Sequence, residues 1–120
     1  MKPGHTGLYR LYKASGYSIQ GFKAAWKYES AIRQEVIMLM ILIPIALIFG
    51  QSAIEKSLLI ASIVLVLIVE LLNAAIEAVV DRVGSEYHEL SGRAKDIGSC
   101  AVLVTLILAA SVWTLILLTN

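Results

Sequence analysis

Residues 57–81 read SLLIASIVLVLIVELLNAAIEAVVD. The first thirteen of these residues carry no charge. Four polar side chains then follow at helical spacing: Glu70, Asn73, Glu77 and Asp81. On a helix these positions fall within an arc of about 80°. The stretch is therefore expected to be a membrane-crossing helix, for which roughly 20 residues suffice, with an acidic face along its last third.

Glu70 is the first charged residue after the apolar run. A carboxylate in this position is costly to keep in lipid, and such residues usually face a bundle interior, a cavity or a partner. Glu77 follows about 10 Å further along the helix axis, so Glu77 is expected near the headgroups and Glu70 deeper. Glu70 is a candidate functional residue on these grounds. A polar seam that specifies helix packing through hydrogen bonds is the alternative explanation of the same spacing.

The composition of the whole chain is that of a membrane protein. Of its 120 residues 58% are hydrophobic and only 16% are charged, and the net charge of +1 does not suggest a nucleic-acid partner. Residues 33–50 and 97–118 are expected to form two further transmembrane helices. Without repeats or linkers, residues 1–120 are expected to form a single membrane domain, with no removable signal peptide. Cys100, the single cysteine, is expected to be a buried thiol.

Residues 7–30 are expected to form a surface helix. Their apolar side chains recur at spacings of three and four, and polar and basic side chains follow on the opposite side. This pattern is typical of an amphipathic helix in the membrane interface. Glu29 falls at the edge of the apolar stripe, where a carboxylate needs a cation or a hydrogen-bond donor. A surface glutamate paired with a nearby lysine or arginine is the alternative for Glu29.

The basic residues predict the orientation of the chain. Six of the ten lie before the first span or at its first residue, three flank the loop expected over residues 83–95, and Lys56 lies between the first two spans. By the positive-inside rule, the N-terminus and the 83–95 loop are expected in the cytoplasm and the C-terminus on the periplasmic side. Glu77, Asp81, Lys95 and Asp96 are then expected to meet at the cytoplasmic interface, where ATP is available.

The acidic residues at this interface suit a magnesium site. Mg²⁺ takes oxygen ligands, typically one or two carboxylates plus substrate phosphates, and Glu77 and Glu29 are the candidates. A carboxylate set deeper in a less polar environment is a stronger base, so Glu70 is expected to act on a hydroxyl presented from within the bilayer. Lys95 is a candidate to neutralise phosphate charge. The sequence contains no phosphate loop, dinucleotide fingerprint or protein-kinase motif.

Two stretches carry a resemblance to a known family. IVELLNAAIEAVVDRVGSEYHELSGRAKDIGSCAVL, residues 68–103, resembles the signature region of the bacterial integral-membrane diacylglycerol kinases. KASGYSIQGFKAAWKYESAIRQE, residues 13–35, is similar to the amphipathic N-terminal segment of that family. The resemblance implies an enzyme of the bacterial inner membrane that phosphorylates diacylglycerol with Mg-ATP to give phosphatidate. It also implies an all-α homotrimer with one interfacial and three transmembrane helices per subunit, and with sites at the subunit interfaces.

The resemblance further implies roles for individual residues. Glu70 matches the catalytic base of the family and Asn73 a supporting asparagine, and Glu29 and Glu77 match its metal-binding glutamates. Nucleotide binding is implied for six positions: Arg10, Tyr17, Glu86, His88, Lys95 and Asp96. Contact with the lipid substrate is implied for nine: Ser15, Lys23, Trp26, Arg33, Glu35, Lys56, Glu70, Ser99 and Trp113. The implied reaction is direct attack of the activated lipid hydroxyl on the γ-phosphate, without a covalent enzyme intermediate.

Other functions stay open at this point. One branch of the same family phosphorylates undecaprenol and shares the motif around Glu70, although residues 84–96 are more similar to the diacylglycerol branch. A small ion-coupled membrane transporter also relies on an embedded glutamate, and a helix-packing subunit without activity is a third possibility. The charges gathered at one interface favour nucleotide binding, because a transporter tends to keep its charge near the midplane.

Overall fold

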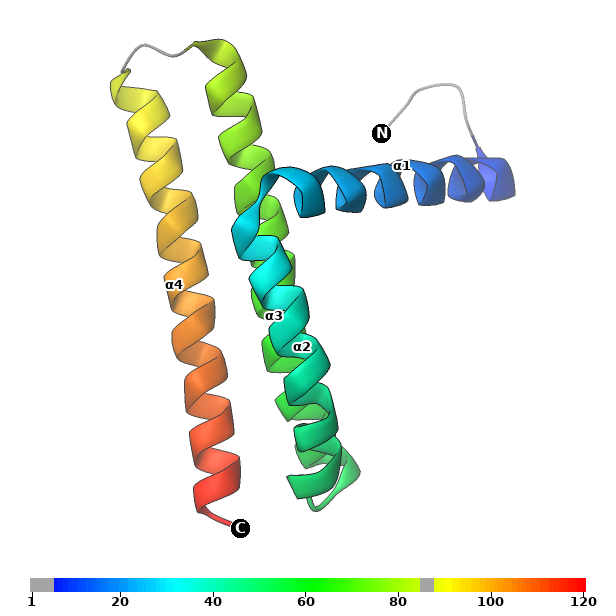
Figure 1. Ribbon diagram of the computed structural model, residues 1–120, viewed down its shortest axis with the longest axis vertical. Helices are drawn as coiled ribbons and strands as arrows, with labels where there is room; N and C mark the ends of the chain where they lie inside the picture. Colours follow the sequence, from blue (N-terminus) through cyan, green and yellow to red (C-terminus); the bar gives the residue numbers. More distant parts are fainter. Residues whose placement is uncertain (1–5, 85–87) are drawn as a thin grey trace.

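The structure, a computed structural model, describes residues 6–84 and 88–120 and is helical throughout these ranges apart from short connections (Figure 1). Its four helices are α1 (Gly7–Tyr28), α2 (Ser30–Phe49), α3 (Ala53–Val83) and α4 (Glu89–Leu118). No strand occurs in the described part of the chain. The predicted all-α class is confirmed.

Three of these helices, α2, α3 and α4, are long and apolar enough to cross a membrane. They contain 20, 31 and 30 residues, against the roughly 20 that a bilayer core requires. Much of their apolar surface is exposed, as at Ile48 and Ile54, which is the arrangement expected where lipid covers a protein. The three predicted spans are confirmed, and the chain is a multi-pass membrane protein.

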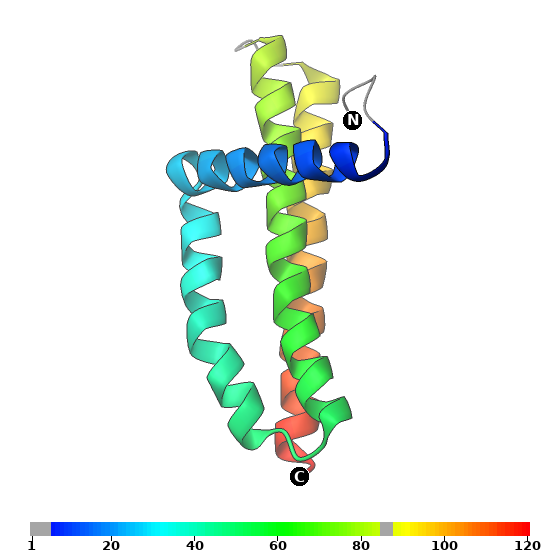
Figure 2. The same cartoon turned by 90° about the vertical axis from the view of Figure 1, so that its right-hand side faces the viewer.

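Helix α3 is the centre of the bundle. It runs antiparallel to α4 along most of its length, and α2 packs against it on another side (Figures 1 and 2). Four of its side chains are buried: Leu59, Ser62, Ile63 and Val66. The indole Nε1 of Trp113 on α4 donates a hydrogen bond to the carbonyl oxygen of Leu59 at 3.1 Å. Both neighbours therefore take their position from α3.

Helix α1 runs across the direction of the other three helices and projects from the bundle (Figure 2). None of its residues is buried. It contacts the bundle mainly at its junction with α2, where the guanidinium of Arg33 donates to the carbonyl oxygens of Trp26 and Lys27. The orientation of α1 is therefore set at this junction.

Two expectations about the start of α4 were wrong. Residues 89–95, expected in a polar loop, form the first turns of α4. His88 explains this start, because its Nδ1 accepts a hydrogen bond from the N–H of Leu90 at 3.0 Å and caps the helix. Cys100, expected to be buried, is exposed, because it lines an open depression formed by residues of α4 alone.

The turn between α2 and α3 is closed by hydrogen bonds around Glu55. Ser52 Oγ accepts from the N–H of Glu55 at 3.1 Å and so caps α3. Glu55 Oε1 accepts from the N–H of Gln51 at 3.0 Å and from Nδ2 of Asn120 at 3.1 Å. The start of α3 is thereby joined to the end of the described chain.

Ser52→Ala is expected to lower the free energy of unfolding by about 1 kcal/mol, because the first turn of α3 loses its cap. The measurement is equilibrium unfolding in mixed micelles by titration with SDS. Ser57→Ala is the matched control, since Ser57 is exposed on α3 and makes no side-chain hydrogen bond to the described residues. Equal losses in the two variants would contradict the role of the cap.

Candidate functional site

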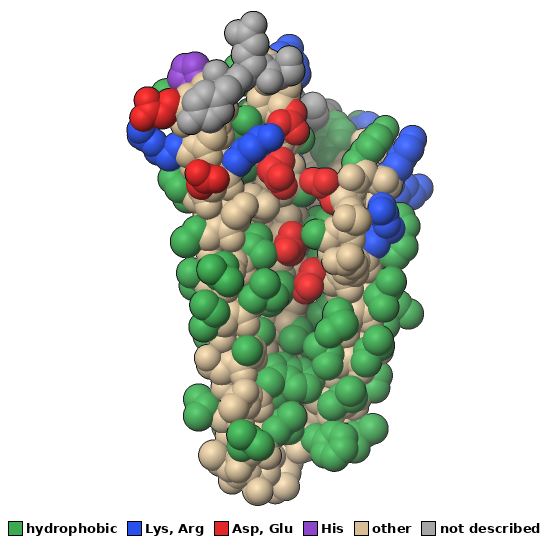
Figure 3. All heavy atoms as spheres, turned by 60° about the vertical axis from the view of Figure 1, so that its left-hand side comes forward, with side chains coloured by type: hydrophobic (Ala, Val, Ile, Leu, Met, Phe, Trp, Pro, Cys, Tyr) green, Lys and Arg blue, Asp and Glu red, His purple; other side chains and the backbone are tan. Residues whose placement is uncertain are grey.

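Three acidic residues, Glu29, Glu77 and Asp81, line a single groove between α1 and α3. The groove has a volume of about 780 Å³ and is walled mainly by small and apolar side chains. Figure 3 shows acidic side chains gathered toward one end of the molecule, while the rest of the face in view is largely hydrophobic. Carboxylates from distant parts of the sequence are thus brought to one hollow.

Glu29 enters the groove because it is the residue at which the chain turns. Its backbone is extended, with φ −119° and ψ 106°, between the end of α1 and the start of α2. Its N–H donates to the carbonyl oxygen of Ala25 at 2.8 Å, and its carbonyl oxygen accepts from the N–H of Ile32 at 3.2 Å. The half-buried Glu29 side chain therefore takes its direction from the change between the two helix axes.

Asn73 and Glu77 lie one turn apart on α3 and interact directly. The amide Nδ2 of Asn73 donates to Glu77 Oε1 at 3.3 Å. This bond holds the carboxylate of Glu77 on the groove side of the helix. The predicted alignment of the two residues on one face is confirmed.

Glu70 lies further along the same face, half-buried between helices. The negative charges that act on it most strongly are those of Glu35 on α2, then Glu77 and Glu29. Among residues 6–84 and 88–120, neither Glu70 nor Glu35 has a basic side chain within ion-pair distance. Three carboxylates therefore add negative potential at Glu70, and a bound cation would offset it.

The donors in the groove fit a magnesium ion that takes its remaining ligands from a substrate. Glu29, between α1 and α2, and Glu77, on α3, both provide carboxylate oxygens to the groove. The hydrogen bond from Asn73 orients one of the Glu77 oxygens. Within the described ranges, no group of three or more acidic, histidine or cysteine side chains forms a metal site. Two carboxylates are the number that Mg²⁺ commonly takes from protein when phosphate and water supply the rest.

Asp81 forms an ion pair with Lys95. Its Oδ1 lies 2.7 Å from Nζ of Lys95 and joins the end of α3 to the start of α4. The predicted meeting of Asp81 and Lys95 at one end of the helices is confirmed. Because Asp81 also lines the groove, the ion pair brings Lys95, a predicted nucleotide residue, to its rim.

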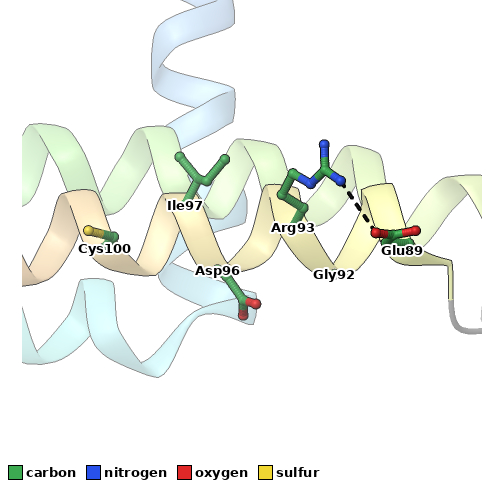
Figure 4. A pocket seen from close by; sticks show the side chains of 6 residues that line it. All are labelled: Glu89, Gly92, Arg93, Asp96, Ile97 and Cys100. Atoms are coloured by element: carbon green, nitrogen blue, oxygen red, sulfur yellow. Dashed lines mark hydrogen bonds and ion pairs between the residues drawn. The ribbon is translucent and has the colours of Figure 1, made fainter.

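The other predicted nucleotide positions are not gathered around this groove. Asp96 lines a shallow depression on α4, beside the pair formed by Arg93 and Glu89 at 3.4 Å (Figure 4). Arg10 lines a separate depression near the start of α1. Within a single chain, these two residues therefore do not belong to the groove.

The remaining three nucleotide positions differ in what the structure says of them. Tyr17 is exposed on α1, and the Nδ1 of His88 is engaged in capping α4. Glu86 lies outside the described residues. Of the two described positions, neither Tyr17 nor His88 lines the groove.

The predicted lipid positions lie in several parts of the molecule. Glu35 on α2 and Glu70 on α3 are both half-buried, on two helices that pack together. Lys56 lies in the first turns of α3, about 21 Å from Glu70 along the helix axis, and Trp113 contacts the same end through Leu59. The other members lie on α1, α2 and α4: Ser15, Lys23, Trp26, Arg33 and Ser99.

Gly98 was not singled out from the sequence, yet it borders the site. It is buried on α4, and a Cβ built there would overlap the side chain of Asn73. In the sequence, Gly98 could have been recognised as a small residue in an otherwise apolar membrane helix, because helix backbones often approach closely at such positions. The close approach of α4 to Asn73 depends on this glycine.

Comparison with known proteins points to one family. The family model described as prokaryotic diacylglycerol kinase matches residues 16–117. The diacylglycerol kinase of Escherichia coli strain K12 is 55% identical over 112 residues, which cover 93% of this chain and 92% of the relative. The diacylglycerol kinase of Pseudomonas aeruginosa is 51% identical over 96% of this chain and 94% of its own. That of Haemophilus influenzae is 50% identical over 90% and 92%.

Proposed function

The chain belongs to the prokaryotic diacylglycerol kinase family, and we propose that it transfers the γ-phosphate of ATP to the hydroxyl of diacylglycerol, giving phosphatidate. The observation that carries the proposal is 55% identity over 93% of the chain with a diacylglycerol kinase. The acidic groove at one end of three membrane-spanning helices supports it, because such a site can meet a water-soluble nucleotide and a membrane lipid at once.

The proposed location is the bacterial inner membrane, with the N-terminus in the cytoplasm and the C-terminus in the periplasm. The distribution of basic residues supports this orientation. Helix α1 crosses the direction of the three spans and exposes apolar side chains such as Leu11 and Ile19. A helix with this direction and surface suits the membrane interface, and we assign it there as part of a single membrane domain.

Glu70 is the proposed general base. It removes the proton from the lipid hydroxyl, which then attacks the γ-phosphate directly and in line, without a covalent enzyme intermediate. The half-buried position of Glu70 on a membrane-spanning helix supports this role, because a lipid hydroxyl approaches from the bilayer. Asn73 supports the site through its hydrogen bond to Glu77.

Glu29 and Glu77 are the proposed magnesium ligands. Mg²⁺ held by them would neutralise charge on the phosphates of ATP. Lys95, held at the groove rim by Asp81, is placed to contact the nucleotide with its ammonium group. Arg10, Tyr17, Glu86, His88 and Asp96 complete the proposed nucleotide contacts.

The proposed enzyme is a homotrimer with its sites at subunit interfaces. In one chain, Arg10 and Asp96 lie in depressions separate from the groove that Glu29 and Glu77 line. Contributions from neighbouring subunits would bring these positions to a common site. The proposed lipid contacts are then shared in the same way: Ser15, Lys23, Trp26, Arg33, Glu35, Lys56, Glu70, Ser99 and Trp113.

The direct test uses purified protein in mixed micelles with Mg-ATP and either diacylglycerol or undecaprenol. The expected outcome is ATP-dependent phosphatidate formation, with little product from undecaprenol. Preferential phosphorylation of undecaprenol would reassign the substrate. A lack of phosphorylated product from both lipids would overturn the kinase proposal.

Glu70→Gln is expected to lower turnover by about 100-fold or more, because the hydroxyl loses its general base. Binding of Mg-ATP should be largely retained, measured by displacement of a fluorescent ATP analogue. Glu55→Gln makes the same change at the opposite end of α3 and should leave turnover near that of the unaltered chain. Near-normal turnover of Glu70→Gln would show that the base lies elsewhere.

Glu77→Gln is expected to change the response to magnesium more than the response to lipid. Loss of a residue that only supports a metal ligand weakens metal binding roughly tenfold. Because Glu77→Gln removes a direct ligand, the Mg²⁺ concentration for half-maximal activity should rise by more than this. The measurement is a magnesium titration at saturating ATP and lipid, with Glu89→Gln as an exposed control. An unchanged titration would contradict the assignment.

Mixed oligomers test whether the site is shared. Asp96→Asn and Glu70→Gln chains are each expected to be inactive, but unfolding and refolding them together should restore part of the activity. Rescue is expected because Asp96 lies outside the groove of its own chain, so some interfaces of a mixed trimer would combine a native Asp96 from one subunit with a native Glu70 from another. If tagged pull-downs demonstrate mixing and activity is still absent, the site is not shared in this way.

A further inference from the structure

The amide oxygen of Asn73 is buried and has no hydrogen-bond partner among the described residues. Such atoms are rare in folded proteins, because a buried acceptor gives up its water without compensation. The other end of the same amide donates to Glu77. Hydrogen bonding therefore fixes only the NH₂ group of the Asn73 amide. The position of its oxygen must be set by packing against neighbouring atoms.

Gly98 on α4 covers this oxygen. A Cβ built on Gly98 would overlap Asn73 Oδ1 and lie 3.1 Å from Asn73 Cγ, but 3.9 Å from Asn73 Cβ. A side chain at position 98 would require the Asn73 amide oxygen to move and would make a tight contact with Cγ, whereas the distance to Cβ is an ordinary van der Waals contact. The conflict thus involves only the amide group of Asn73 and not the α3 backbone.

The Glu77 carboxylate determines which way the Asn73 amide faces. A carboxylate only accepts hydrogen bonds, so the NH₂ group must face Glu77 and the oxygen must face Gly98. We propose that Gly98 is a positioning residue, which holds the Asn73 amide against Glu77 and thereby holds the Glu77 carboxylate in the groove opposite Glu29. The role in magnesium binding rests on the proposed function above, whereas the coupling of Gly98 to Asn73 does not.

A role limited to helix packing makes a different prediction. If Gly98 only allowed α3 and α4 to approach, a methyl group there would destabilise the protein whatever residue occupies position 73. If Gly98 acts through Asn73, the effect of the methyl group must vanish when the Asn73 amide is removed. Double-mutant cycles separate these possibilities.

The first experiment compares Gly98→Ala, Asn73→Ala and the double variant by magnesium titration of kinase activity. Gly98→Ala is expected to raise the Mg²⁺ concentration for half-maximal activity about tenfold, as for loss of an outer-shell partner. In the Asn73→Ala background, Gly98→Ala should cause no further change. Equal effects of Gly98→Ala in both backgrounds would overturn the proposal.

The second experiment does not depend on activity. The chain contains two asparagines, Asn73 and Asn120, so labelling with ¹⁵N-asparagine gives two side-chain NH₂ signals by NMR, which Asn73→Ala assigns. Glu77→Gln should shift the Asn73 signal in the native background and leave it unshifted in the Gly98→Ala background. A shift of equal size in both backgrounds contradicts the positioning role, even if the enzyme proves to be a kinase.

Gly16→Ala is the matched control, because a Cβ at Gly16 on α1 meets no atom within 4 Å. It should change neither the magnesium titration nor the Asn73 signal. If Gly98→Ala alone fails to fold, the double variant with Asn73→Ala should recover folding, because the overlap is relieved. Failure of the double variant as well would place the role of Gly98 in the α3–α4 backbone contact and overturn the proposal.

Discussion

The cost of placing carboxylates on membrane-spanning helices is the constraint on which this structure depends. Glu35 and Glu70 belong to helices whose outer surfaces are apolar, and both are half-buried toward the interior. With no basic side chain of the described residues within ion-pair distance, these carboxylates require shielding from lipid by neighbouring helices. The packing of α2 and α4 around α3 provides that shielding.

The same packing also forms the site. Because α3 carries the acidic face along its last third, the elements that cover this face become the walls of the groove. The turn at Glu29 brings a second carboxylate to Glu77 and directs α1 across the end of the bundle. The Asp81–Lys95 pair then closes α3 onto α4 at the same end. The helix packing that shields the carboxylates from lipid therefore also forms the groove that can bind charged groups.

Helical periodicity and hydropathy were sufficient to predict the three spans and the alignment of Asn73 with Glu77, because both depend on residues near each other in sequence. The start of α4 differs from the prediction, because Gly92 and the surrounding polar residues suggested a loop. The hydrogen bond by which His88 caps the helix allows α4 to begin at Glu89 instead. Cys100 was misplaced for a related reason. An apolar sequence does not distinguish a side chain covered by protein from one covered by lipid.

The sequence by itself determined the helical class, the membrane-spanning segments, the acidic face of α3 and the family, because each is encoded in residue order and local spacing. Only the tertiary structure decided that Glu29 and Glu77 line one groove, that Asp81 pairs with Lys95 and that Gly98 packs against Asn73. The physical reason is that these contacts depend on how each helix is rotated and how closely it packs. Rotation and separation are set by side chains from segments far apart in the chain, and no local pattern contains that information.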